Sequence, residues 1–156
     1  MDLKFQSNSR SLLDIFFKQV TELGSLTIVL IAVLFAYFFN NILALQLFIG
    51  IASVTIVSFI IKATFFHERP KKQAVNNLVE RLDASSFPSI HSARITVLVF
   101  WLIVYSSGIV LKIILVAIGL TVAYSRIYLK KHYYADVIGG IILALIASLI
   151  MYLSLG

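Results

Sequence analysis

Cysteine is absent from this chain of 156 residues. Its absence excludes disulfide bonds, thiolate metal sites and cysteine nucleophiles, and it leaves the redox compartment undetermined. Histidine is scarce too, with three residues in all. No cluster of carboxylates accompanies them in the sequence, so the potential ligands are too few for a metal site. We therefore expect neither a metal ion nor another cofactor.

Charge is also scarce. Only 13% of the residues are charged and 60% are hydrophobic, with a mean hydropathy of +0.99. A soluble domain of this length needs far more charge on its surface, so the composition indicates an integral membrane protein. The net charge of +6 suits anionic lipid headgroups or phosphate substrates. Because the cations flank apolar segments and form no basic domain, we expect no nucleic-acid partner.

Five apolar runs are long enough, or nearly so, to cross a hydrocarbon core of about 30 Å. They lie near residues 24–40, 42–62, 88–106, 109–126 and 134–154. The sequence thus predicts an all-α fold, a polytopic membrane helix bundle of about five transmembrane helices. We expect a multi-pass protein of the cell membrane, surrounded by bilayer lipids and without an obligate protein partner. Residues 1–156 form one predicted domain, with the bundle at 24–154.

Two further segments have an apolar stripe at helical spacing. In residues 1–23, before the first span, Leu12, Ile15 and Phe16 belong to such a stripe and predict a helix in the membrane interface. The long loop 63–87 contains a second stripe, formed by Val75, Leu78, Val79 and Leu82. This second pattern is equally typical of a short interfacial helix over a site and of a solvated connector that touches lipid.

Three short polar segments lie at the ends of the apolar runs. They are Lys62-x6-Arg69-Pro70, then Ser86-Phe87-Pro88-Ser89-Ile90-His91, then Ser125-Arg126-x5-His132-x3-Asp136. Alternation of the spans places all three on one face of the membrane, whereas unrelated polar residues would scatter over both faces. Their convergence predicts a single active-site region that includes the loop 63–87.

The residue types in these segments suit the handling of phosphate. A phosphate monoester or diphosphate brings at least two negative charges, which Lys62, Arg69 and Arg126 can neutralise. In-line transfer needs a nucleophile on one side of phosphorus and an acid on the other, and two histidines fill these roles without metal. His132 and Asp136 are spaced i, i+4, so on one helix face the carboxylate can orient the imidazole and leave its other nitrogen free.

The second segment begins the third span. His91 lies there beside Ser89, where backbone N–H groups also favour an anion. Arg94 and Ser125 are additional candidates for contact with phosphate, although Arg94 is about as typical of an interface anchor. In the last span, Gly139-Gly140 predicts close helix packing.

In order and spacing, the three segments resemble the signature of the type-2 phosphatidic acid phosphatase superfamily, K-x6-R-P, P-S-x-H and S-R-x5-H-x3-D. The resemblance covers residues 42–154. It implies a helical membrane enzyme that hydrolyses lipid phosphates through a phosphohistidine, without metal. By this likeness His132 is the nucleophile, His91 the general acid and Asp136 the orienting partner. The residues implied to bind phosphate are Lys62, Arg69, Arg126 and Ser89.

The chain departs from the family pattern at Ile90, where the family commonly has Gly. A β-branched residue does not readily adopt a positive φ, so we expect regular backbone there. The small size resembles the compact bacterial-type polyprenyl (undecaprenyl) diphosphate phosphatases, which implies a polyprenyl diphosphate substrate. Phosphatidylglycerophosphate and phosphatidic acid phosphatases share the signature, so both substrates stay open.

The sequence argues against two other classes of protein. Vanadate-dependent haloperoxidases share the signature but are soluble, which five spans argue against. A non-enzymatic lipid-phosphate binding or transport protein would tolerate the loss of a catalytic histidine, and both histidines are present here.

The charge distribution and the family resemblance predict opposite sides of the membrane for the site. By alternation the motif side carries twelve of the thirteen Lys and Arg residues, and the other side carries Lys112. The positive-inside rule then predicts a cytoplasmic site. The family resemblance implies an extracytoplasmic one.

Overall fold

The computed structural model describes residues 2–70 and 84–155, with side chains from residue 11 onward. Regular structure within these ranges is entirely helical, as predicted. Its elements are α1 (Asp2–Val20), the 3-10 helix η1 (Thr21–Gly24), α2 (Leu26–Phe39), α3 (Asn41–Thr64), α5 (Ile90–Tyr105), α6 (Ile109–Tyr128) and α7 (Tyr134–Leu155). The stripe predicted at residues 75–82 lies outside the described residues.

All five predicted spans are helical, but their lengths differ. Helices α3, α6 and α7 are each long and apolar enough to cross a membrane. Helix α2 has 14 residues, and the helical segment before it meets it at an angle of 53°. Helix α5 has 16 residues, which at about 1.5 Å per residue gives about 24 Å. Helix α3, the second of the five apolar runs, is therefore long enough to cross a membrane by itself, whereas α5, the third run, is shorter.

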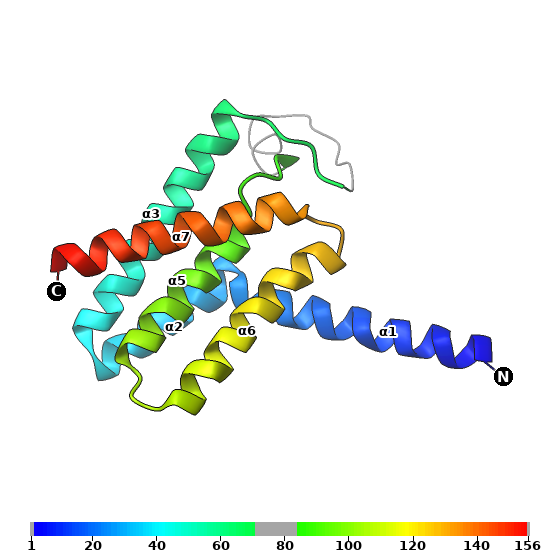
Figure 1. Ribbon diagram of the computed structural model, residues 1–156, viewed down its shortest axis with the longest axis horizontal. Coiled ribbons are helices and arrows are strands. Elements are labelled where there is room, and N and C mark those ends of the chain that lie inside the picture. The colour runs from blue at the N-terminus through cyan, green and yellow to red at the C-terminus, as the bar shows by residue number, and fades with distance from the viewer. Residues whose placement is uncertain (1, 71–83, 156) are drawn as a thin grey trace.

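Helix α5 is buried or half-buried along most of its length. It packs against α3, α6 and α7 at the centre of the bundle (Figure 1). Its Val97 and Trp101 are buried in one core cluster with Leu47 and Val54 of α3. Gly50 brings α3 close, because a Cβ there would lie 2.8 Å from Val97 Cγ1. Backbone that is enclosed by protein does not have to span the lipid as a helix.

Polar side chains set where several helices begin. Ser25 accepts a hydrogen bond from the Ile28 amide at the start of α2 (3.4 Å). Asn40 Oδ1 accepts from the amides of Ile42 and Leu43 at the start of α3, both at 3.0 Å. Such caps satisfy backbone N–H groups that have no partner within the helix. The chain therefore turns sharply between α2 and α3.

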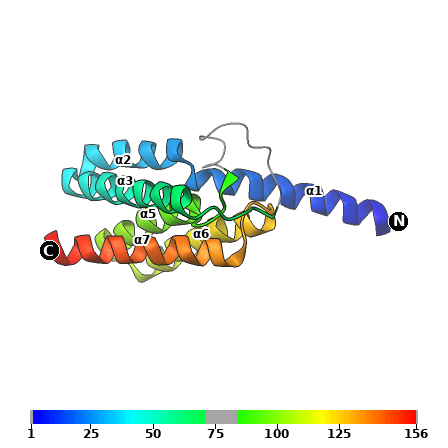
Figure 2. The ribbon, with the colours of Figure 1, turned by 90° about the horizontal axis from the view of Figure 1, so that it is seen from above.

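Helix α1 projects away from the bundle at the end opposite the C-terminus (Figure 2). Phe17 anchors it on α6, where its ring centroid lies 4.3 Å from that of Tyr128. The Tyr128 hydroxyl donates to Asp14 Oδ1 (2.9 Å). Leu12 and Phe16 are exposed. The predicted N-terminal helix is present, and its exposed apolar side chains suit an interfacial position.

Candidate active site

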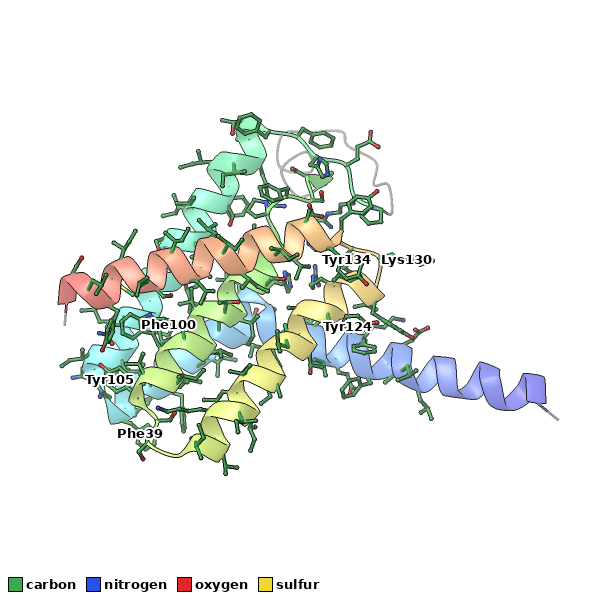
Figure 3. The ribbon with its side chains drawn as sticks, in the orientation of Figure 1. Phe39, Phe100, Tyr105, Tyr124, Lys130 and Tyr134 are labelled. Carbon is green, nitrogen blue, oxygen red and sulfur yellow. The ribbon has the colours of Figure 1, made fainter. Side chains whose placement is uncertain are left out.

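The three polar segments meet at one end of the bundle, where α6 ends and α7 begins. Figure 3 shows Lys130 and Tyr134 at this end and Phe39 and Tyr105 at the opposite end. At the end of α3, Lys62 Nζ donates to the backbone carbonyl of Ser85, which joins the first segment to the chain just before the second. The predicted convergence on one end of the molecule therefore holds for the described residues.

A pair of buried serines ties the first segment to the second. The Ser86 amide donates to the His67 carbonyl (2.7 Å), and the Ser86 hydroxyl donates to the Glu68 carbonyl (3.2 Å). The His67 amide donates in turn to Ser85 Oγ (3.3 Å). Sequence reasoning gave neither serine a role, and the only signal was a Ser-Ser pair directly before the motif. The segment before α5 is thus held in place by backbone groups of residues 67–68.

The second segment lies against the first turns of α7. The Ser89 amide donates to the Asp136 carbonyl (2.9 Å). A Cβ on Gly140 would lie 2.4 Å from the Ser89 carbonyl oxygen, and one on Gly139 would lie 2.4 Å from the Phe87 ring. The glycine pair does permit close packing, as predicted, but chiefly of the non-helical motif segment. Helix α5 therefore starts beside the second turn of α7.

The start of α5 has the regular backbone expected for Ile90, which is the first residue of the helix. Ser89 is its N-cap: its hydroxyl oxygen accepts from the Ser92 amide (3.5 Å) and from the Ser92 hydroxyl (3.0 Å). The Ser89 side chain is fully buried. Its contact with phosphate stays a prediction.

His132 and Asp136 form a buried pair. His132 Nδ1 lies 3.5 Å from Asp136 Oδ2, and that oxygen also accepts from the Tyr133 amide (2.8 Å). The prediction that both lie on one helix face is wrong, because His132 belongs to the loop before α7 and Asp136 to its first turn. A carboxylate in the first turn can accept from amides that precede the helix. The pair comes together through that turn.

Cations of both the first and the third segment influence the pKa of His132. Burial lowers the pKa of His132 to about 4, and the nearby carboxylate of Asp136 opposes this shift. The positive charges of Arg126, Arg69 and Lys62 lower the pKa further. At neutral pH the imidazole is therefore uncharged, which is the form that has a lone pair available for attack.

His91 shares this electrostatic neighbourhood. The charges of Arg126, Arg94 and Lys131 act on its imidazole, as does His132. The 3-10 helix η1 lies directly against it, because a Cβ on Gly24 would be 2.9 Å from the His91 carbonyl oxygen. Both predicted catalytic histidines therefore lie within the field of Arg126.

Arg126 has a partner that the motifs do not contain. Its Nη1 donates to Thr21 Oγ1 at 2.8 Å. The two residues are 4% and 2% exposed, so this contact is enclosed by protein. Thr21 belongs to η1, within a segment that the sequence predicted only to be a helix in the membrane interface. The spacing of apolar residues could not have predicted the contact between Thr21 and Arg126.

The two additional candidates have partners within the bundle. Arg94 Nε donates to Thr55 Oγ1 of α3 (3.1 Å). The Ser125 hydroxyl donates to the Val122 carbonyl (2.5 Å). Contact of either side chain with phosphate stays a prediction.

A cavity of about 440 Å³ adjoins the site at the same end of the bundle. Side chains from α1, η1, the first segment and the loop after α6 line it: Lys18, Thr21, Glu22, Arg69, Leu129, Lys130 and Lys131. In the part of the chain that the structure describes, no three His, Cys, Asp or Glu side chains are placed to hold a metal ion. Metal independence stays a prediction.

Comparison with known proteins agrees with this geometry. The model of the PAP2 superfamily matches residues 25–156. Undecaprenyl-diphosphatase BcrC of Bacillus subtilis (strain 168) is 26% identical over 151 residues, which cover 94% of this chain and 77% of that protein. Two solved structures share the fold. LpxE of Aquifex aeolicus has a TM-score of 0.76 at 27% identity, covering 89% of this chain and 84% of that one.

The second solved structure is a PAP2-type phosphatidylglycerolphosphate phosphatase of Bacillus subtilis. Its TM-score is 0.74 at 22% identity, with 90% of this chain and 75% of that chain covered. The family match spans most of the sequence. The chain therefore belongs to the PAP2 superfamily and is an integral membrane member of it, as its motifs predicted.

Proposed function

We propose that this protein hydrolyses the terminal phosphate of a polyprenyl diphosphate lipid. The observation that carries the proposal is the gathering of two histidines and the motif cations at one end of a membrane bundle, with His132 paired to Asp136 at 3.5 Å. The substrate is inferred from the likeness to an undecaprenyl-diphosphatase over 94% of this chain. The phosphatidylglycerolphosphate phosphatase is similar at 22% identity, which supports only a common fold.

The chemistry takes two steps. His132 attacks through Nε2, the nitrogen remote from Asp136, and an N–P bond forms as the P–O bond to the leaving group breaks. His91 gives its proton to the leaving oxygen, which releases a polyprenyl monophosphate. Water then attacks the phosphohistidine and gives a proton to His91. The N–P bond breaks with its electron pair returning to His132, and orthophosphate leaves.

The cations of the site prepare both steps. Lys62, Arg69 and Arg126 neutralise the phosphate oxygens, whose charge would otherwise repel the electron pair of the nucleophile. The bound phosphate in turn favours the protonated form of His91, because a negative charge nearby stabilises an imidazolium. The imidazole of His132 is uncharged before substrate binds.

The test is phosphate release by purified protein in detergent from a panel of lipid phosphates. We expect the highest kcat/KM with a polyprenyl diphosphate, followed by phosphatidylglycerophosphate and phosphatidic acid. Rapid quenching with a labelled terminal phosphate should trap a phosphoprotein of the acid-labile kind formed by histidine. A clear preference for another lipid would overturn the proposed substrate, and no release from any lipid would overturn the proposed reaction.

A further inference from the structure

The charged lining of the cavity beside the site is strongly unequal in sign. Among the described residues that line it, four cations, Lys18, Arg69, Lys130 and Lys131, face a single carboxylate, Glu22. They come from separate parts of the chain: α1, the first segment and the loop that follows α6. A concave surface lined by one sign of charge attracts and concentrates ions of the other sign. The cavity therefore suits an anion.

Arg69 connects this cavity to the predicted catalytic residues. It lines the cavity, and its charge also acts on His132. Thr21 forms a second connection, because it lines the cavity and accepts the hydrogen bond of Arg126. An anion in the cavity would thus lie directly beside a phosphate held by the motif cations.

Lys130 stands where a lysine is unfavourable for the backbone. It follows the end of α6, its amide donates to the Ile127 carbonyl (2.9 Å), and its φ is 54°. Among the non-glycine residues of the described ranges, it alone has a positive φ. Glycine or asparagine is favoured at such a position, and other residues lose about 1 kcal/mol or more there. A use for the exposed ammonium group explains why the position carries a lysine.

We propose that the cavity binds the second phosphate of the substrate headgroup through Lys18 and Lys130, while the motif cations hold the phosphate that is transferred. This inference rests on the proposed function. In a diphosphate the two phosphorus atoms share one bridging oxygen, so the second phosphate must lie next to the first. A cavity that shares Arg69 with the catalytic residues meets this requirement. A lipid monophosphate has no group to place there.

The decisive variants are Lys18→Met and Lys130→Gly. The second removes the charge and relieves the positive φ, so it should not destabilise the fold. Lys112→Met, at the opposite end of the bundle, is the matched control. Lys131 and Arg69 are left intact because their charges act on the two histidines.

The first measurement is kcat/KM for a prenyl diphosphate and for the prenyl monophosphate of the same chain, both in neutral detergent micelles. Each substitution removes a charge-assisted hydrogen bond to the second phosphate. We therefore expect the diphosphate-to-monophosphate ratio to fall about tenfold in each variant, a change of about 1.4 kcal/mol. Lys112→Met should keep the ratio. Equal losses for both substrates in folded variants would overturn the proposal.

The second measurement separates this inference from the proposed function. Equilibrium affinities for pyrophosphate and orthophosphate in the same micelles need no turnover. A selective loss of pyrophosphate affinity in the two lysine variants would support the subsite, even if the wild-type protein hydrolysed no diphosphate and the proposed function fell. Equal weakening of both anions would overturn the subsite. It would also be overturned if the variants differed from wild type only in micelles containing anionic lipid, which would assign the cavity to a neighbouring headgroup.

Discussion

The two ends of the helix bundle are built in different ways. At one end Asn40 and residues 106–108 form short uncharged turns, and the half-buried Asn40 caps the start of α3. At the other end Lys62, Arg126 and Asp136 are no more than 4% exposed. Burying a charge costs several kcal/mol unless partners offset it. The first end therefore has no such cost at these turns, whereas the second depends on partners such as the Ser85 carbonyl for Lys62 and Thr21 for Arg126.

The largest effect should come from His132→Ala at the charged end. Without the nucleophile, kcat should fall by about 10⁴-fold or more, and no phosphoprotein should be trapped. His67→Ala is the matched control, because His67 is exposed and makes its contacts to the serines through backbone atoms. Turnover within about tenfold of wild type in a folded His132→Ala protein would remove His132 as the nucleophile.

A glycine-to-alanine substitution should lower the stability of the protein at the charged end of the bundle more than at the opposite end. Gly140→Ala places a Cβ 2.4 Å from the Ser89 carbonyl oxygen, whereas Gly108 has no atom within 4 Å of a Cβ. Overpacking of this kind costs about 1–3 kcal/mol, and it should also displace the second motif and lower turnover. Gly108→Ala should change stability by less than about 0.5 kcal/mol. Denaturant unfolding in detergent measures both, and equal stabilities would contradict the close contact.

Thr21→Val should weaken substrate binding, because the Arg126 guanidinium loses the acceptor at 2.8 Å. Thr21→Ser keeps that acceptor. Losing a charged hydrogen bond typically costs about 1.5–3 kcal/mol, so kcat/KM should fall about tenfold in the valine variant, mainly through KM. Serine should restore most of it. If valine and serine behaved alike, the threonine would have a packing role only.

Acid pH should affect His132 less than an exposed histidine. Its folded-state pKa is about 4 and its usual value is 6.5, so the imidazole stays uncharged until the pH falls towards 4. Between these values the unfolded chain binds a proton that the folded protein does not, and stability therefore declines as pH falls from 6.5 to 4. Imidazole NMR titration in micelles, with His67→Ala to assign signals, measures this. A midpoint near 6.5 would contradict the burial and cation effects.

Chelation should have the smallest effect of all. The chain has three His and no Cys, and the mechanism derived above uses side chains alone. Excess EDTA should leave kcat/KM within about twofold of its starting value. If EDTA abolished activity and a divalent metal restored it, the two-histidine mechanism would have to be abandoned, whatever the outcome for His132→Ala.

Much of this architecture could be predicted because it depends on local patterns. Apolar runs located the helices, and the spacing of the motifs located Lys62, His91 and His132. What could not be predicted depends on contacts between distant segments. Thr21 lies in a segment that was predicted from its apolar stripe alone, and nothing in its neighbours indicates that Arg126 reaches it. The loop position of His132 was missed because i, i+4 spacing fits a helix as well as a turn that leads into one.

The hydrogen bond between Thr21 and Arg126 joins residues that are 105 positions apart. During synthesis the N-terminal segment is therefore made long before its partner exists. His132 and Asp136 are made later still, so a ribosome has completed most of the chain before the first complete site can assemble. Lys62 likewise precedes by some seventy residues the histidine whose pKa it lowers. A chain that stopped before His132 would thus contain Lys62 and Arg126 and still lack the nucleophile that we propose.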